Sequence, residues 1–204
     1  DKRYTRYCDS SSPDVVTRCR TSGKADYLFA VNDRREFGDY VGQHGLVMEN
    51  GLPSEATLSL GRSRGAVYDL TTGRELEATP RGGRLQIQRR FGPCEGCVLL
   101  VTEEKIEAVT IQAPESVKRG KPLATQVCVA DAKGRPVDAV VPVKVEVLDP
   151  SGASAEWSGY YGAKGGQLAL KFDIAPNDRT GLWQICVKEL ASGRASSAYF
   201  RVSE

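Results

Sequence analysis

Apolar and polar residues alternate along most of this chain. The alternation is clearest at residues 56–60, 84–90, 141–148 and 167–174, where the apolar residues fall on alternate positions. A period of two is typical of strands that bury one face in an antiparallel sheet. No segment of ten or more residues keeps a helical period, and glycine is more frequent than in an average protein. The pattern predicts an all-β protein.

Turn residues separate these short strands at intervals of about 8 to 12 residues, as they do in β-sandwiches. A charged segment, T-E-E-K-I-E at residues 102–107, divides the series. We therefore predict two consecutive antiparallel β-sandwiches, residues 1–105 and residues 106–204, the second immunoglobulin-like. The strands of the second sandwich are expected at residues 109–111, 123–130, 141–148, 155–161, 167–174, 181–189 and 197–202.

An acid at the apolar end of a strand, with a glycine three or four residues later, occurs four times. The acids are Asp69, Asp131, Asp149 and Glu189. Asp is favoured at the start of a turn because its carboxylate caps backbone N–H groups, and glycine is favoured later because it accepts positive φ. Asp69, in G-A-V-Y-D-L-T-T-G-R, is accordingly predicted to be the corner of a hairpin and not part of a working site.

Charge and hydropathy exclude several partners. The net charge is +2 over 204 residues, so neither nucleic acid nor an acidic membrane surface is expected to bind. The arginines at residues 81–90 alternate with apolar residues and are expected on a solvated strand face. No apolar run approaches the length of about 20 residues that a membrane span needs. The charged opening D-K-R-Y-T-R favours a mature protein or a fragment of a longer one.

The cysteine count suggests an oxidising compartment, so we expect a secreted, periplasmic or cell-surface protein. The spacing suggests three local disulfides, Cys8 with Cys19, Cys94 with Cys97, and Cys128 with Cys186. The last two cysteines lie out of phase with the apolar residues of their strands, which favours a bond on the outer face of one sheet. A zinc site is not expected, because four ligands are needed and only one C-x-x-C and one histidine, His44, are present.

Two segments resemble known families. Y-L-F-A-V-N, Y-D-L-T-T-G-R and G-C-V-L-L-V, within about residues 25–102, resemble the small C-terminal β-sandwich of β-galactosidase-like glycoside hydrolases. A-P-E-S-V-K-R-G-K-P-L, V-L-D-P-S-G and G-L-W-Q-I-C-V, within about residues 108–204, resemble a macroglobulin-like or fibronectin-like module. The resemblance implies an accessory region of a larger secreted protein, whose catalytic acids would lie in a barrel that this sequence does not contain.

The residues that catalysis would need do not assemble into a motif. His44 stands between glycines without a G-x-S-x-G elsewhere, and is expected in a loop with no catalytic role. Asp33, Glu36 and Asp39, beside two arginines, are expected to form solvated ion pairs in a polar loop. The C-x-x-C at residues 94–97 is expected at a hairpin tip and not at a helix start, which disfavours redox chemistry. No catalytic residue, metal or cofactor is predicted.

Two weaker candidates for binding remain. Asp131, Asp149 and Asp173 lie in or beside turns and could contribute to a calcium site, although no D-x-D-x-D-G loop is present. The aromatic residues Trp157, Tyr160 and Tyr161, in E-W-S-G-Y-Y-G, are candidates for stacking on sugar rings. The alternative is that Trp157 and Tyr161 cover the core and leave Tyr160 outside.

The function predicted from these patterns is a non-catalytic accessory or scaffold region of a larger multidomain protein. Its expected partners are neighbouring domains of the same parent chain, with polysaccharide as a further candidate. The first alternative is a carbohydrate-binding module that uses the aromatic cluster. The second alternative is a protein–protein interaction module of a cell-surface protein.

Overall fold

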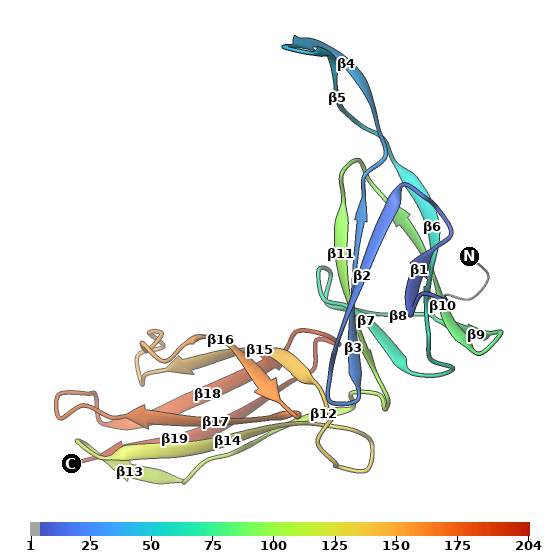
Figure 1. Cartoon of the computed structure of the whole chain (residues 1–204). Coiled ribbons are helices and arrows are strands. Elements are labelled where there is room, and N and C mark those ends of the chain that lie inside the picture. Colours follow the sequence, from blue (N-terminus) through green and yellow to red (C-terminus); the bar gives the residue numbers. More distant parts are fainter. Residues whose placement is uncertain (1–4) are drawn as a thin grey trace. The chain divides into compact units, whose positions relative to one another are not determined.

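The computed structural model describes residues 5–204, so the first four residues of the charged opening lie outside it. The chain folds as two compact units, one of residues up to Thr21 with Asp26–Glu103, the other of Ser22–Ala25 with Glu104–Glu204. Both units consist of strands (Figure 1). The predicted all-β class with antiparallel sheets is confirmed. Within residues 5–204 no helix has the length and apolarity that a membrane crossing requires.

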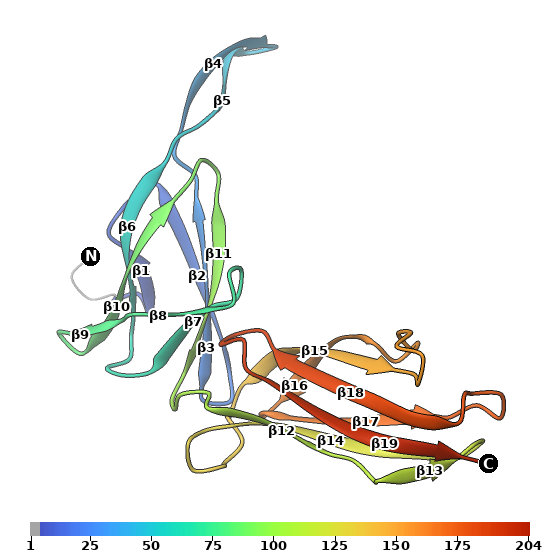
Figure 2. The same ribbon diagram turned by 180° about the vertical axis from the view of Figure 1, so that it is seen from behind.

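The first unit contains two facing sheets and a separate two-stranded ribbon (Figure 2). The four-stranded sheet has the order β1 (Cys8–Ser10), β6 (Ser54–Leu60), β10 (Arg84–Phe91) and β9 (Thr79–Arg81). The five-stranded sheet has the order β2 (Val15–Ser22), β3 (Ala25–Asn32), β11 (Gly96–Thr102), β7 (Ala66–Asp69) and β8 (Arg74–Leu76). The ribbon pairs β4 (Arg35–Gly42) with β5 (Gly45–Gly51).

The alternate apolar residues of the two sheets meet between them and form the core of the first unit. Leu58, Leu60 and Ile87 come from the four-stranded sheet, and Leu28 and Leu99 come from the five-stranded sheet. Each of these side chains is fully buried. Burying such a side chain stabilises the fold by about 1.5–3 kcal/mol, so the pairing of these two faces is what holds the sheets together.

The second unit is one eight-stranded sheet that bends back on itself. Its order is β12 (Ala108–Gln112), β14 (Pro122–Ala130), β17 (Gln167–Asp173), β16 (Gly159–Lys164), β15 (Val140–Leu148), β18 (Gly181–Glu189), β19 (Ala195–Ser203) and β13 (Ser116–Lys118). A single residue pair, Lys164 with Gln167, joins β16 to β17, and the sheet turns there. The β13–β19 pair is parallel, whereas the other pairs given for the described residues are antiparallel.

One strand of the second unit starts later than the alternation predicts. The alternation predicts a strand at residues 155–161, but residues 155–158 form a turn in which the Ser158 N–H donates to the Ala155 carbonyl at 3.0 Å. The strand β16 therefore begins at Gly159. Ala155 and Trp157 are two residues apart, as alternate apolar residues of a strand would be, but the backbone at these positions forms a local turn.

The four predicted corners share one hydrogen-bonding arrangement, and all four are confirmed. The carboxylate of Asp69 accepts from the Thr71 N–H, that of Asp131 from the Lys133 N–H, and that of Asp149 from the Ser151 N–H. Glu189 is buried and accepts from three N–H groups, those of Ala191, Ser192 and Arg194. Each acid thus satisfies backbone donors that the turn takes out of the sheet.

Asp69 makes one contact that the hairpin-corner prediction does not include. Arg89, on β10 of the opposite sheet, lies with its Nη1 2.8 Å from the Asp69 Oδ2, and the Asp69 side chain is completely buried. Burial by itself raises the pKa of this carboxyl, but the hydrogen bonds from Thr71 and the Arg89 charge outweigh it, so that its pKa lies below the ordinary value. The corner therefore also ties the two sheets of the first unit together.

Replacing Asp69 by Asn should destabilise the first unit in a pH-dependent way. A carboxyl whose pKa is lower in the folded state stabilises the fold above its unfolded pKa, and this contribution is lost as the pH falls through the folded pKa. We expect Asp69→Asn to lower the free energy of unfolding by about 2–3 kcal/mol at neutral pH, with the difference from the wild type shrinking below pH 3.8. Denaturant unfolding at a series of pH values measures this.

The neighbouring ion pair supplies the control. Arg90 pairs with Glu55 on the solvent side of the same strand, where both side chains are exposed, so Glu55→Gln should change stability little. Equal losses for the two variants, or a loss for Asp69→Asn that does not depend on pH, would contradict the role assigned to the buried pair.

The predicted disulfides are wrong for this structure, in which all six cysteines are free. Cys8 and Cys19 lie on strands of opposite sheets. Cys94 is exposed in the turn before β11, with its Sγ beside Gly51, whereas the Cys97 side chain is buried among the core residues. The sulfurs of the C-x-x-C motif therefore point in different directions.

The third predicted pair is separated by the sheet order. Cys128 on β14 and Cys186 on β18 are both half-buried, out of phase with the core as predicted. Three strands, β17, β16 and β15, lie between them in the sheet. Neighbouring strands are about 4.8 Å apart, whereas a disulfide needs Cα atoms within about 7 Å. Two outward-pointing cysteines that are four strand spacings apart along the sheet therefore do not form a disulfide.

Thiol titration checks this correction directly. Unfolded in denaturant without a reductant, the chain should release six reactive thiols, whereas three disulfides would release none. In the folded chain Cys94 should react first, because it is exposed. Cys97 and Cys19 should react slowly, because burial raises the pKa of Cys97 to about 11, and burial together with the Asp26 charge raises that of Cys19 to about 12.

Candidate interaction site

The ribbon β4–β5 leaves the two sheets of the first unit and extends beyond them (Figure 1). Gly42 pairs with Gly45 at its end, so Gln43 and His44 form the turn. Gly45 has a φ of +115°, which glycine adopts without strain. His44 is exposed in this turn, and its predicted place in a loop is confirmed.

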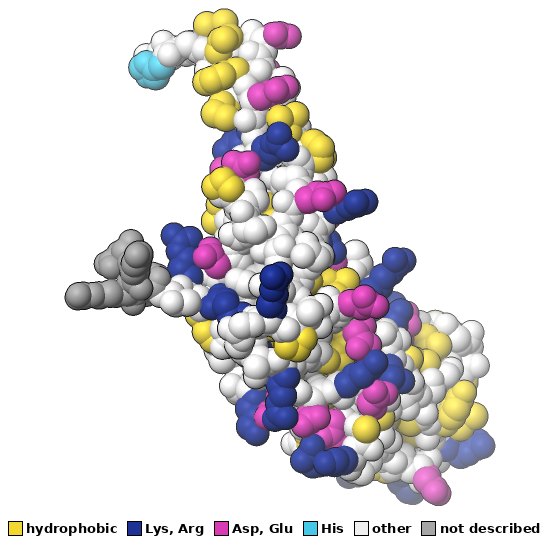
Figure 3. Space-filling model, turned by 90° about the vertical axis from the view of Figure 1, so that its right-hand side faces the viewer, with side chains coloured by type: hydrophobic (Ala, Val, Ile, Leu, Met, Phe, Trp, Pro, Cys, Tyr) yellow, Lys and Arg dark blue, Asp and Glu magenta, His cyan; other side chains and the backbone are white. Residues whose placement is uncertain are grey.

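One side of the ribbon presents four large apolar side chains to solvent. Phe37 pairs with Met48 and Val41 pairs with Leu46, and cross-strand partners point to the same side of a sheet. Their exposed fractions are 61%, 45%, 65% and 55%. We call these four residues the hairpin face. Figure 3 shows hydrophobic side chains along the projecting ribbon.

The ribbon is irregular, and this limits how it can bind. Its register shifts between Glu36 and Phe37 and again between Phe37 and Val41. On the other side, Glu49 packs over Gly38, where a Cβ would lie 2.1 Å from the Glu49 Cγ. Bulges of this kind twist a strand edge and protect it from pairing with a further strand. The ribbon is therefore suited to contacts through side chains more than to strand addition.

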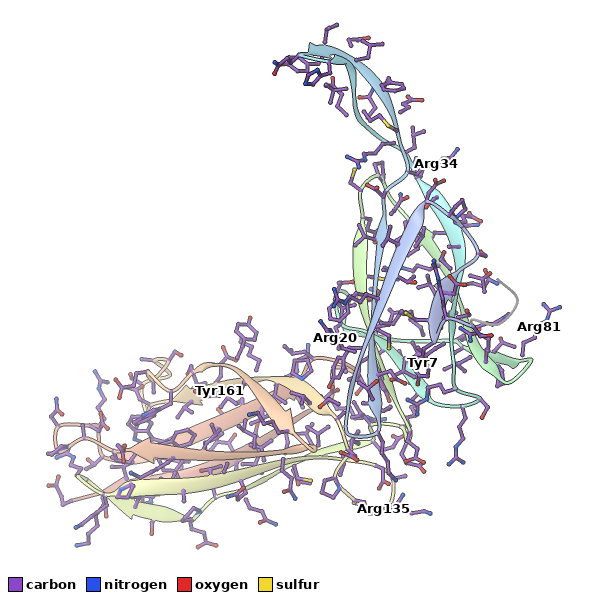
Figure 4. All side chains as sticks on the ribbon, in the orientation of Figure 1. Tyr7, Arg20, Arg34, Arg81, Arg135 and Tyr161 are labelled. Atoms are coloured by element: carbon purple, nitrogen blue, oxygen red, sulfur yellow. The ribbon has the colours of Figure 1, made fainter. Side chains whose placement is uncertain are left out.

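A buried amide fixes the base of the ribbon. The Asn32 Nδ2 donates to the carbonyls of Leu52 (2.7 Å) and Gly92 (2.8 Å), and its Oδ1 accepts from the Ser54 hydroxyl (2.9 Å) and the Arg34 N–H (3.1 Å). These bonds use the full capacity of the amide. Because Asn32 joins the chain entering the ribbon to the chain leaving it, the ribbon departs in one direction. Figure 4 labels Arg34 at this point.

The acids on the ribbon lack partners. Arg35 pairs with Asp33 at the base, at 2.8 Å. Within residues 5–204, no ion pair involves Glu36, Asp39 or Glu49. The expectation of a polar loop in which Asp33, Glu36 and Asp39 form solvated ion pairs is therefore wrong for Glu36 and Asp39, which lie unpaired on the strand β4. The acids alternate with exposed apolar residues on the strand β4. The charged residues at positions 33–39 resemble a polar loop, so the sequence pattern does not predict this strand.

The structure separates the three aromatic residues predicted to bind sugar. The Trp157 ring is half-buried and lies 5.3 Å from the Phe172 ring and 6.1 Å from the Trp183 ring, centroid to centroid. The Tyr161 hydroxyl donates to the Trp157 carbonyl at 2.7 Å (labelled in Figure 4). Tyr160 is 75% exposed and points the other way. A shared stacking platform is not formed.

Trp157 instead borders a mainly polar cavity of about 390 Å³ in the second unit. Ser154, Asn177 and Asp178 also line it, residues to which no sequence motif pointed. Asp149 lines it too, but its carboxylate is occupied by its own turn. The contact of Trp157, Tyr160 and Tyr161 with sugar stays a prediction.

The calcium candidates do not come together. Asp131 is held by Arg135, with its Oδ2 2.7 Å from the Arg135 Nη2, and Asp173 pairs with Lys171 at 2.9 Å. Among residues 5–204 no cluster of three or more histidine, cysteine or acidic side chains is arranged to hold a metal ion. Each of these acids serves the turn or strand on which it lies.

No family model matches the chain, and no curated protein matches it either. Among solved structures, the superoxide reductase (neelaredoxin) of Ignicoccus hospitalis is 14% identical, with a TM-score of 0.36 over 48% of this chain and 82% of that chain. The Yersinia pseudotuberculosis adhesin InvE is 11% identical, with a TM-score of 0.40 over 96% of this chain and 60% of that chain.

A Bacteroides fragilis protein assigned as a β-galactosidase is 14% identical, with a TM-score of 0.29 over 90% of this chain and 33% of that chain. At these low scores, function has to be argued from the side chains of this chain. Its relation to β-galactosidase-like accessory domains and to macroglobulin-like modules stays a prediction.

Truncating Trp157 separates its two roles. Because its ring packs on Phe172 and Trp183, we expect Trp157→Ala to lower the free energy of unfolding of the second unit by about 2–3 kcal/mol, whereas Tyr160→Ala should leave it unchanged. Denaturant unfolding measures both.

Affinity electrophoresis on polysaccharide gels completes the test. Retardation lost in a Trp157→Ala chain that is still folded, at unchanged stability, would make Trp157 a ligand contact and contradict its assignment to packing.

Proposed function

We propose that this chain is a non-catalytic interaction module that attaches to another protein surface through the β4–β5 hairpin. The observation that carries the proposal is the hairpin face, whose four large apolar side chains are each at least 45% exposed. Six of the thirteen exposed large apolar residues found within residues 5–204 lie on this hairpin. Apolar exposure concentrated in this way marks an interaction surface.

The hairpin has no structural need for these residues. A two-stranded hairpin is marginal alone, and one that served only as a connection would be expected to carry polar residues on both sides. Here the apolar side chains point away from any core, while Asn32 and its four hydrogen bonds hold the base. The arrangement presents an apolar surface on a fixed support.

The acids favour a protein partner over a membrane. Glu36, Asp39 and Glu49 lie on the same two strands as the apolar residues and outnumber Arg35. The anionic leaflet of a membrane attracts basic segments and repels acidic ones. A protein groove that is apolar at its centre and lined by Lys or Arg at its rim matches both features of the hairpin. The predicted attachment to neighbouring domains of a parent chain belongs to this class of contact.

The cellular location and the binding of polysaccharide stay predictions. The secreted, periplasmic or cell-surface location rested on disulfides that the structure does not contain. Polysaccharide binding now concerns the cavity beside Trp157 and not a cluster of three aromatic rings.

Photocrosslinking from the hairpin tests the proposal. A photoreactive phenylalanine derivative at position 46, in the full-length protein in its own cells, should crosslink to a discrete segment of one protein surface, identified by mass spectrometry. Met48→Ser, on the same face, should reduce the yield of that crosslink. Position 182 is the matched control, because Leu182 is 51% exposed but lies on the second unit. Scattered or absent crosslinks from position 46 would overturn the proposal.

A further inference from the structure

A second exposed apolar surface lies on the first unit, on the outer side of β2 and β3. Val16 on β2 is 60% exposed, and Phe29 and Val31 on β3 are 39% and 48% exposed. Their sequence neighbours Val15, Leu28 and Ala30 are buried in the core, which places the exposed set on the outer side. Together with the hairpin, this surface holds nine of the thirteen exposed large apolar residues.

Two arginines accompany this surface. Arg18 and Arg20 alternate with Val16 along β2, and both are exposed. Within residues 5–204 neither makes an ion pair. Figure 4 shows Arg20 on the outer side of the strand. We call Val16, Arg18, Arg20, Phe29 and Val31 the β2–β3 face.

The two surfaces are complementary in both chemistry and charge. The hairpin face is apolar and has two unpaired acids beside it, Glu36 and Asp39, whereas Glu49 lies on the other side of the ribbon. The β2–β3 face is apolar and has two unpaired arginines beside it. Opposite charges around an apolar contact steer association and fix its orientation. An acidic rim of Glu36 and Asp39 that meets a basic rim of Arg18 and Arg20 pairs four charges for which residues 5–204 of one copy supply no ion pair.

We propose that the hairpin face of one copy docks on the β2–β3 face of a second copy. The inference rests on the proposed function and names its partner. The hairpin does not lie on its own β2–β3 face, because it forms a separate sheet that extends beyond the first unit's other strands (Figure 1). Figures 1 and 2 both show its end curving toward the side of the first unit on which the five-stranded sheet lies.

The size of the contact favours a reciprocal dimer. Four large apolar side chains remove on the order of 400 Å² of surface from water, so one contact covers about 800 Å² in total, which is no more than a crystal contact. Two equivalent contacts, related by a twofold axis, reach about 1,600 Å², the size of a stable interface. Each copy therefore gives its hairpin to the other and accepts one in return.

Sedimentation velocity and charge reversal test this arrangement. The wild-type chain should dimerise with rising concentration. Reversing the acids with Glu36→Lys and Asp39→Lys, or the arginines with Arg18→Glu and Arg20→Glu, should weaken dimerisation about a hundredfold or more, because each puts like charges opposite one another. Arg74→Glu with Arg81→Glu, exposed arginines away from both faces, changes the charge equally and should leave dimerisation intact.

Mixing the two reversed chains gives the sharpest outcome. The acid-reversed chain carries a basic hairpin and a basic β2–β3 face, and the arginine-reversed chain carries an acidic hairpin and an acidic face. Both contacts of a mixed dimer are complementary, so the mixture should form a heterodimer although neither chain forms a homodimer. Circular dichroism confirms that each variant is folded.

A wild-type chain that stays monomeric, or reversed chains that stay apart on mixing, would overturn the inference. The photocrosslink from position 46 separates this failure from that of the proposed function. A crosslink to β2 or β3 of a second copy supports both. A discrete crosslink to a different protein retains the proposed function and overturns the second-copy inference. Absent or scattered crosslinks overturn both.

Discussion

The fold depends on carboxylates that close its turns. An all-β chain of short strands must reverse direction many times, and each reversal leaves backbone N–H groups outside the sheet. At four corners an acid accepts from those groups, and at Glu189 three of them share one buried carboxylate. Asp69 extends this role, since its ion pair with Arg89 reaches across the core to the opposite sheet. The Asp69 side chain thus both closes its turn and joins the two sheets.

A different polar residue holds the base of the hairpin that carries the proposed interaction surface. Asn32 is buried, and each of its donors and acceptors is used at the point where the chain leaves the sandwich and returns. Satisfied buried polar groups specify one arrangement of the backbone. The hairpin is consequently held at its base, although its apolar residues have no core to pack on. A rigid base and an exposed apolar end are what attachment to another surface requires.

Local chemistry explains which parts of the structure were predictable. Alternation identifies strands because one face is buried, and an acid followed by glycine identifies corners because both act within a few residues. These signals predicted the strands of the second unit with two exceptions. They missed the three-residue strand β13 (Ser116–Lys118), and near Trp157 a turn spaces apolar residues like a strand. They failed at residues 33–51, because a strand whose apolar residues are exposed to solvent resembles neither a half-buried strand nor a polar loop.

The sequence by itself determined the all-β class, the corner acids and the outward phase of Cys128 and Cys186, since all of these follow from period and local hydrogen bonding. Only the tertiary structure decided which strands are neighbours. It placed three strands between those two cysteines, turned Tyr160 away from Trp157, and paired Asp69 with Arg89. The same long-range packing put an acidic apolar hairpin and a basic apolar face on one unit. Contacts between residues distant in sequence depend on how whole sheets fit together, which no local pattern encodes.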